Sequence, residues 1–358
     1  MYSYKQFLPL ESMLMVVVFL TVVDGAWGVP DGTISAEEGR LFPLGFYELP
    51  EDDAALQAMA EAGVNLVRCR NREDLDRLQA LGMKGVMPLP FQHGATDALR
   101  EKVAGLVDHP ALVIWEGPDE IVWNFTAYSG LFRTMGIHSV QGAWWKQTPE
   151  AVAYAEEKAA EIIPNMRACV AMIRELDTQD RPVWINEAQS SDTYYVRQYL
   201  DFVDITGCDI YPVKKEKREL ERIGCGVERW LKVGRGKPVY MVLQAFSWNE
   251  LGDYYGVKDT AYPSFAESRF MAYDSIVRGA SGILYWGSHY LKSDAFRHAI
   301  YALTSELSAL QPFLVVLLRQ GRAMLRPVTL SLVEGIIGGS RHAGDQDKQE
   351  KHAPNQYG

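Results

Sequence analysis

The sequence predicts an α/β protein built as one (β/α)8 barrel, the TIM-barrel fold. From residue 41 the chain alternates eight times between a short apolar run and a longer amphipathic segment, which is the pattern of eight consecutive strand–helix units. Glycine stands at three of the joins between a helix and the next strand, at Gly63, Gly82 and Gly279, where a helix has to stop. A doubly wound open sheet is the alternative fold, but no G-x-G-x-x-G motif follows the first strand.

The expected strands are short, rich in valine, isoleucine and aromatic residues, and bounded by glycine, proline or aspartate. Such near-continuous apolar runs are typical of parallel strands that are buried on both faces. The strands are expected at residues 42–47, 64–69, 83–89, 112–116, 183–187, 203–209, 238–244 and 281–286.

The segments between these strands have the hydrophobic period of helices. Acidic residues or proline stand in the first turn of two of them, in Glu51-Asp52-Asp53 and in Thr148-Pro149-Glu150, as at many helix starts. The helices are expected at residues 51–62, 72–81, 95–107, 149–176, 192–200, 214–232, 263–279 and 293–310.

The N-terminal segment has the layout of a secretory signal peptide. Lys5 precedes a short apolar run at 13–23, and Ala26 and Gly28 are small residues at a suitable spacing for cleavage. We therefore expect residues 1–28 to direct the protein to a secreted or periplasmic location, with membrane association only if this segment is retained as an anchor.

The expected barrel domain covers residues 41–311, and two further regions follow it. Residues 312–338 are an apolar C-terminal extension that could begin a truncated accessory domain, and the polar residues 339–358 are expected to be disordered.

Composition excludes several classes of function. A net charge of -10 over 358 residues argues against nucleic-acid binding, which needs a basic face. The four cysteines have no C-x-x-C spacing and no H-E-x-x-H motif occurs, so we expect neither a metal nor another cofactor. The G-x-S-x-G motif of esterases and the phosphate-binding P-loop are also absent from the sequence.

In a barrel of this kind, catalytic groups lie at the C-terminal ends of the strands. The fourth expected strand ends in IWEGPDE, residues 114–120, which places three carboxylates within five residues. The polar and aromatic candidates at the strand ends are Tyr47, Glu116, Asp119, Glu120, Glu187, Asp209, Tyr211, Gln244 and Trp286, with Arg68 and Asn186 also at strand ends.

Four stretches of the chain carry a resemblance to a known group of proteins. They are the Asp-Glu ending of the fourth strand, GCDIYP at 207–212, VLQAF at 242–246, and YPSFAESRFMAYDSIVRGASGILYWG at 262–287. Over residues 41–311 the sequence resembles glycoside-hydrolase-like TIM barrels of the broad clan that includes many retaining β-glycosidases.

The resemblance implies roles for particular residues. The general acid/base of that clan is a glutamate at the end of strand four, usually preceded by asparagine, which implies that role for Glu120, with Asp119 in the place of the asparagine. The clan's nucleophile is a glutamate at the end of strand seven, where this chain has Gln244. Glutamine cannot form a glycosyl ester, so the second carboxylate has to come from another residue, for which Asp209 and Glu187 are the candidates.

The remaining strand-end candidates are expected to bind the substrate. Gln244 would hydrogen-bond a sugar hydroxyl or position a water, Trp286 would be a platform for a sugar ring, and Asp119, Glu116, Tyr47 and Tyr211 would line the site.

Each candidate also has a structural alternative. Glu120 could cap a helix, Glu116 could pair with Arg68 inside the barrel, and Asp209 could hydrogen-bond Tyr211. Glu187 could cap the following helix and Trp286 could be a core residue.

Together these observations predict a secreted, cofactor-free glycoside hydrolase that cleaves an oligo- or polysaccharide with paired carboxylates, Glu120 acting as the general acid. The rival hypothesis is a catalytically silent, carbohydrate-binding barrel that lacks the strand-seven nucleophile. A barrel enzyme of unrelated chemistry is a third possibility, because a fold does not fix a function.

Overall fold

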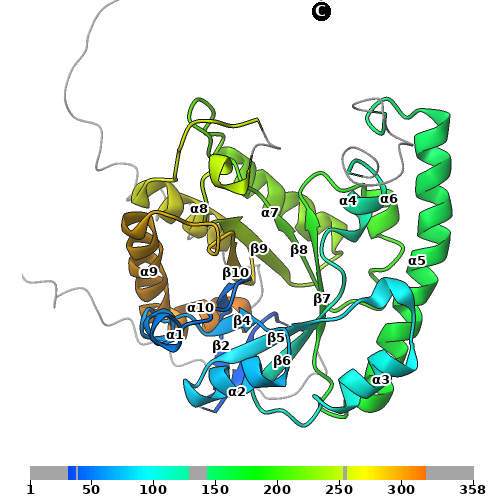
Figure 1. The fold of residues 1–358 in the computed structure, drawn as a ribbon, viewed down its shortest axis with the longest axis horizontal. Helices are drawn as coiled ribbons and strands as arrows, with labels where there is room; N and C mark the ends of the chain where they lie inside the picture. Colours follow the sequence, from blue (N-terminus) through cyan, green and yellow to red (C-terminus); the bar gives the residue numbers. More distant parts are fainter. Residues whose placement is uncertain (1–30, 38, 129–142, 253–255, 320–358) are drawn as a thin grey trace, which may run out of the picture.

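The computed structural model describes residues 31–37, 39–128, 143–252 and 256–319. Within these residues, eight parallel strands close into a barrel in the order β10-β3-β4-β5-β6-β7-β8-β9, so each strand pairs with its neighbour in sequence and the last pairs with the first (Figure 1). The predicted (β/α)8 fold is confirmed. The strands are β3 (Leu44–Phe46), β4 (Leu66–Arg68), β5 (Lys84–Pro88), β6 (Leu112–Glu116), β7 (Val183–Ala188), β8 (Ile205–Asp209), β9 (Val239–Gln244) and β10 (Gly282–Trp286).

Each expected strand coincides with one of these eight, with β7 one residue longer than expected, and the helices follow as predicted with two main differences in length. Seven of the eight helices named below follow a residue whose side chain accepts a hydrogen bond from the first turn, as Asp52 does from Ala55 and Ser264 does from Glu267. The helices are α1 (Asp53–Glu61), α2 (Arg72–Ala80), α3 (Asp97–Ala104), α5 (Pro149–Leu176), α6 (Thr193–Val196), α7 (Glu221–Val233), α8 (Phe265–Val277) and α9 (Asp294–Ala309).

The differences lie in α6, which is a single turn, and in α7, which starts later than expected. The chain before α7 forms an antiparallel bridge between Val213 and Arg218, and the Lys214 N–H donates to the carbonyl of Lys217. These bonds hold residues that would otherwise form the first turns of the helix.

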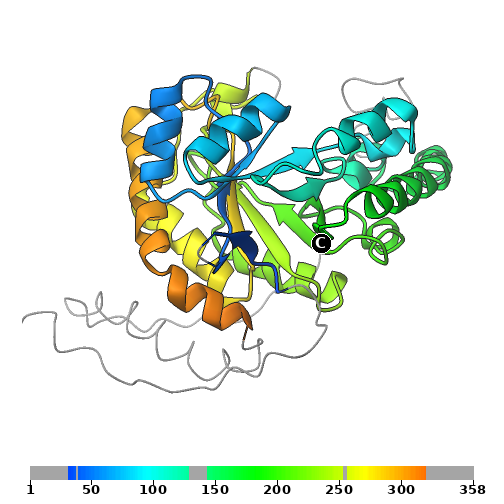
Figure 2. The ribbon, with the colours of Figure 1, turned by 90° about the horizontal axis from the view of Figure 1, so that it is seen from below.

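Four short elements were not predicted. The hairpin of β1 (Ile34–Ala36) and β2 (Gly39–Leu41) lies at the end of the barrel where the strands begin (Figure 2). There the Tyr240 hydroxyl donates to the carbonyl of Gly32 at 2.6 Å. Two 3-10 turns, η2 (Phe91–His93) and η3 (Trp248–Leu251), follow the third and seventh barrel strands.

The helices α4 (Ile121–Phe125) and α10 (Gln311–Arg319) complete the described elements. Helix α4 directly follows the fourth barrel strand, and α10 occupies the start of the predicted C-terminal extension, where it contacts α9 and β2. No single helix among the described residues is long and apolar enough to span a membrane, although α9 and α10, bent by 62°, pass that test as a pair. The predicted signal peptide, the rest of the extension and the predicted disordered tail lie outside the described residues.

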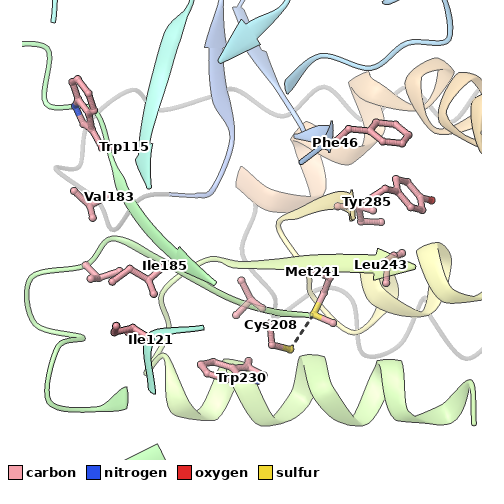
Figure 3. Packing of buried hydrophobic residues seen from close by; sticks show 14 of the residues in the cluster. Phe46, Trp115, Ile121, Val183, Ile185, Cys208, Trp230, Met241, Leu243 and Tyr285 are labelled. Carbon is pink, nitrogen blue, oxygen red and sulfur yellow. Dashed lines mark hydrogen bonds between the residues drawn. The ribbon is translucent and has the colours of Figure 1, made fainter. Parts of the chain in front are cut away.

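The buried apolar side chains form two layers. One fills the interior of the barrel and includes Leu66, Ile114, Trp184 and Tyr240. The other lies between the barrel and its helices; Figure 3 shows Cys208 of β8 and Met241 of β9 in contact at 3.7 Å above Trp230 of α7. Cys69 and Cys208 are buried free thiols, as expected.

Candidate active site

The C-terminal ends of the strands bring polar side chains from different parts of the chain to one rim, which we call the mouth of the barrel. Because alternate residues of a barrel strand face inward, the last inward position of each strand lies at this rim. Tyr47 follows β3, Arg68 ends β4, Glu116 ends β6, Asn186 lies near the end of β7, and Asp209 ends β8.

Glu116 and Arg68 form an ion pair across the mouth. The Arg68 Nε donates to Glu116 Oε2 at 2.6 Å, which confirms the predicted pairing. Glu116 is fully buried, and burial raises the pKa of its carboxyl to about 7 against the opposing effect of Arg68. The Arg68 guanidinium also lies 5.1 Å from the centre of the Tyr47 ring, a cation–π distance. Arg68 therefore links the first, second and fourth barrel strands.

Asp119 lies beside this pair and is held by an amide. The Asn186 Nδ2 donates to Asp119 Oδ1 at 3.0 Å, and the Tyr47 hydroxyl is 3.5 Å from the same oxygen. Burial raises the pKa of Asp119, while Arg68 and these donors oppose the rise. Asp119 thus belongs to the mouth, as predicted.

Glu120 has an unusual backbone conformation. It precedes α4 as the N-cap residue with φ 50° and ψ 39°, in the left-handed region that L-residues seldom adopt. Its N–H donates to the carbonyl of Asn186 at 2.9 Å, and its own carbonyl accepts from Asn124 at 2.8 Å. Its side chain makes no capping hydrogen bond to α4, although it occupies the N-cap position. Strain of this kind costs roughly 1–3 kcal/mol and tends to occur where function requires a particular geometry.

The Glu120 carboxyl lies close to the carboxyl of Asp209 at the mouth. Burial, and then repulsion from Asp209 and Asp119, raises the pKa of Glu120 well above its usual range. Burial and repulsion from Asp119 raise the pKa of Asp209 to about 7, while Glu120 and the Tyr211 hydroxyl hydrogen-bond its ionised form. Because the two carboxyls are close, their titrations are linked, and both hold their protons more strongly than an isolated carboxyl does. Asp209 also lies beside Tyr211, in line with the structural alternative for Asp209.

Glu187 has a different place from the one predicted. It is fully buried, and its carboxylate accepts from the backbone N–H groups of Val122 at 3.0 Å and Trp123 at 3.4 Å. It also accepts from the Ser191 hydroxyl at 2.7 Å and the Tyr199 hydroxyl at 3.0 Å. In place of the predicted base or nucleophile, Glu187 is therefore the anchor that holds the first turn of α4. This helix precedes Glu187 in the chain, whereas the structural alternative expected Glu187 to cap the following helix.

Gln244 also departs from its predicted role. The side chain is fully buried, and its Oε1 accepts from the Val213 N–H at 3.0 Å. Its Nε2 donates to the carbonyls of Val213 and Phe246, both at 3.0 Å. With both amide hydrogens committed to the backbone, Gln244 is not available to a sugar hydroxyl or an attacking water, and it fixes the loops after β8 and β9.

Aromatic rings line the side of the mouth formed by β8, β9 and β10. Trp286 stacks on Tyr211 with ring centres 5.3 Å apart at 25°, and Phe246 meets Trp286 edge to face at 5.1 Å. Trp286 and Tyr211 are half-buried, so part of each ring faces the mouth. Trp286 is thus neither a fully buried core residue nor free of packing partners.

A cavity of about 720 Å³ adjoins the mouth between the first two barrel strands and the helices α1 and α9. Tyr47, Glu48 and Arg68 line its inner side, and His289 and Arg297 its outer side. The described residues contain no group of three or more histidine, cysteine, aspartate or glutamate side chains able to hold a metal ion.

The barrel matches several solved structures of β-galactosidases. The enzyme from the Antarctic haloarchaeon Halorubrum lacusprofundi aligns with a TM-score of 0.52 at 16% identity, covering 75% of this chain and 58% of its own. The enzyme from Marinomonas ef1 aligns with a TM-score of 0.51 at 13% identity, covering 75% of this chain and 60% of its own. The enzyme from Bacillus circulans sp. alkalophilus aligns with a TM-score of 0.50 at 12% identity, covering 78% of this chain and 57% of its own. The chain shares the barrel fold of these enzymes.

This glycoside-hydrolase-like barrel spans less than two thirds of each of those enzymes. No protein-family model and no curated protein matches the chain. At this level of identity the likeness concerns the fold, so the chemistry has to be argued from the residues of the mouth.

Two contacts of the mouth were not predicted from the sequence. They are the cation–π contact of Arg68 with Tyr47 and the hydrogen bond from Asn186 to Asp119. Asn186 stands two residues after Trp184, whose side chain lies inside the barrel. Because side chains two residues apart on a strand point the same way, the sequence could have predicted that Asn186 points inward.

Proposed function

We propose that the protein cleaves glycosidic bonds in an oligo- or polysaccharide at the mouth of the barrel, with Glu120 as the proton donor and Asp209 as its partner. The observation that carries the proposal is the closeness of these two carboxyls beside an aromatic wall, where burial and neighbouring carboxyls raise the pKa of both. A glycosidic oxygen leaves as a hydroxyl only after protonation, and a carboxyl of raised pKa is the group that provides this proton near pH 7.

In this proposal Glu120 transfers its proton to the glycosidic oxygen as the bond to the sugar breaks. Asp209 is the carboxylate that takes up a proton from the attacking water, and the Tyr211 hydroxyl stabilises the ionised form of Asp209. Paired-carboxylate hydrolysis uses separations of about 5–5.5 Å for retention and about 6.5–9.5 Å for inversion. In this proposal a sugar and a water enter between the two carboxyls. The wider, inverting separation suits a route without a carboxylate at Gln244.

The aromatic wall supports a sugar as the ligand. Stacked rings such as Trp286 and Tyr211 give a broad, rigid apolar surface at a small entropic cost, while the carboxyls and Asn186 provide hydrogen-bonding groups next to it.

The test is the substitution Glu120→Gln, which keeps the shape of the side chain and removes its proton. Reducing-end release from a panel of soluble polysaccharides should fall at least about 100-fold, the usual contribution of a general acid. Glu175→Gln is the matched control, because Glu175 pairs with Arg100 on the exposed surface of α5 and α3. Full activity of Glu120→Gln would refute the assignment.

A second function, carbohydrate binding without hydrolysis, is favoured by two residues. Gln244 is an amide whose hydrogen bonds are fixed by the backbone, and the Glu187 carboxylate is occupied by donors, so neither supplies a second catalytic carboxylate. In that case the wild-type protein would bind a glycan of the panel without releasing reducing ends, and Glu120→Gln would bind it equally well.

We also propose that the protein is exported and loses its first 28 residues. Expression in a secretory host followed by mass spectrometry of the medium or periplasm tests this. Recovery of the uncleaved chain in the membrane fraction would instead assign residues 1–28 as an anchor.

A further inference from the structure

Hydrogen-bond acceptors outnumber donors at the mouth. Four carboxyl groups gather there, on Glu116, Asp119, Glu120 and Asp209, and the one guanidinium in contact with them is that of Arg68. Arg68 Nε is bonded to Glu116, which leaves the other three carboxyls without a cation in contact among the described residues.

Two buried oxygens in this group receive no hydrogen bond. Glu116 Oε1 and Asn186 Oδ1 have no donor among the described residues, and both side chains are at most 1% exposed. A buried polar atom without a partner costs roughly 1–3 kcal/mol, so native structures seldom leave one without a purpose. Asn186 cannot turn its amide over without facing its oxygen toward Asp119, which it now holds through Nδ2. Asn186 Oδ1 can only accept, and Glu116 Oε1 accepts when its carboxyl is ionised, so the partner that the two oxygens lack is a donor.

The surrounding charges do not supply that donor. Glu48 and Glu187 add negative potential at Asp119 and at Glu120 respectively. Two other basic side chains have partners of their own: Lys214 Nζ lies 4.3 Å from the Trp248 ring centre, and His289 Nδ1 lies 3.2 Å from Glu48 Oε1. Among the described residues, the titratable groups that act on one or more of the four carboxyls include Tyr47, Glu48, Arg68, Glu187 and Tyr211.

We infer that the mouth recognises a sugar carrying a free ammonium group, an amino sugar, in preference to its neutral counterpart. This inference rests on the proposed function and specifies its substrate class.

An ammonium group fits these acceptors better than a hydroxyl does. It presents three donors and no acceptor, whereas a hydroxyl presents one donor and adds acceptor lone pairs to a site that already has a surplus. Hydrogen bonds from a charged donor to a carboxylate are about twice as strong as neutral ones. The bound cation also favours the ionised carboxyls, so binding should release protons.

The experiment compares matched sugars by isothermal titration calorimetry at pH 7. The pairs are methyl β-glucosaminide with methyl β-glucoside and methyl β-galactosaminide with methyl β-galactoside, with the N-acetylated amines as uncharged controls. In at least one pair the amine should bind about tenfold more tightly, the difference between one charge-assisted and one neutral hydrogen bond. Affinity should fall on going to pH 5, where the carboxyls gain protons, and the binding heat should depend on the ionisation enthalpy of the buffer.

Asp119→Asn is the variant that tests the site, and Asp201→Asn is its control, because Asp201 pairs with Arg167 on the exposed surface. Asp119→Asn should lose the preference for the amine, so that the amine and the neutral sugar of a pair bind to the variant with similar affinity. Glu116→Gln is a second variant with the same expectation, and the wild-type comparison remains decisive if both variants fold poorly.

The outcomes separate this inference from the proposed function. Equal affinity for amine and neutral sugar in both pairs overturns the inference and leaves a carbohydrate site in place. Binding of neither sugar in either pair overturns both. Tighter binding of the amine without hydrolysis of any glycan supports the inference and favours the non-catalytic function.

Discussion

Replacing Glu187 with alanine should be among the most destabilising single changes in the barrel. The substitution removes the acceptor of four donors, the N–H groups of Val122 and Trp123 and the hydroxyls of Ser191 and Tyr199. Three of these bonds are 3.0 Å or shorter and buried, and each orphaned donor costs roughly 1–3 kcal/mol. Since the two hydroxyls can rotate toward other acceptors, we expect a loss of about 3–5 kcal/mol in the free energy of unfolding.

Glu187→Gln keeps one acceptor oxygen and the shape of the side chain, so it should cost only about 1–2 kcal/mol at pH 7. Its effect should depend on pH, because burial raises the pKa of Glu187 from 4.5 to about 7. The folded state therefore keeps a proton that the unfolded chain has released. This stabilisation is fully present below pH 4.5 and is lost as the pH rises through 7, a change of about 3 kcal/mol that the glutamine variant lacks.

Urea unfolding followed by tryptophan fluorescence and circular dichroism between pH 4.5 and 8 measures both effects. Glu161→Ala is the control, because Glu161 is exposed and its ion pair is with Lys158 on the same helix, so its loss should stay within about 0.5 kcal/mol. If Glu187→Ala unfolds within about 1 kcal/mol of the wild type with an unchanged m-value, Glu187 does not anchor α4 in the way described.

Two further substitutions test the mouth. Arg68→Met should destabilise the fold by about 3–5 kcal/mol, because it leaves Glu116 buried without its cation. The double variant with Glu116→Gln should recover most of that loss in the same urea assay. An Arg68→Met variant as stable as wild type would contradict this. Gln244→Glu should cost about 2–4 kcal/mol at pH 8 and less at pH 5, because its ionised carboxylate would face the carbonyls of Val213 and Phe246. It should also add no glycosidase activity, and a gain in reducing-end release would show that position 244 reaches the substrate.

The eight strands could be predicted because a parallel strand that is buried on both faces has a recognisable local sequence, a short apolar run between glycine, proline or aspartate. The long helices have equally local signals, such as Thr148 capping α5 and Ser264 capping α8. The hairpin of β1 and β2 was missed because its two strands have three residues each and depend on the barrel end that they cover. The start of α7 was misplaced because the bridge of Val213 to Arg218 competes with the helix.

The sequence by itself determined the barrel and the set of residues at its mouth, since strand order and the two-residue period of a strand fix which side chains reach the rim. It did not determine which of those side chains are free to act. Glu120 and Glu187 are both glutamates near the end of a barrel strand, yet one lies close to Asp209 at the rim and the other is saturated by four donors. Hydrogen-bond partners come from segments distant in the chain, as Val213 does for Gln244, so only the tertiary structure assigns them.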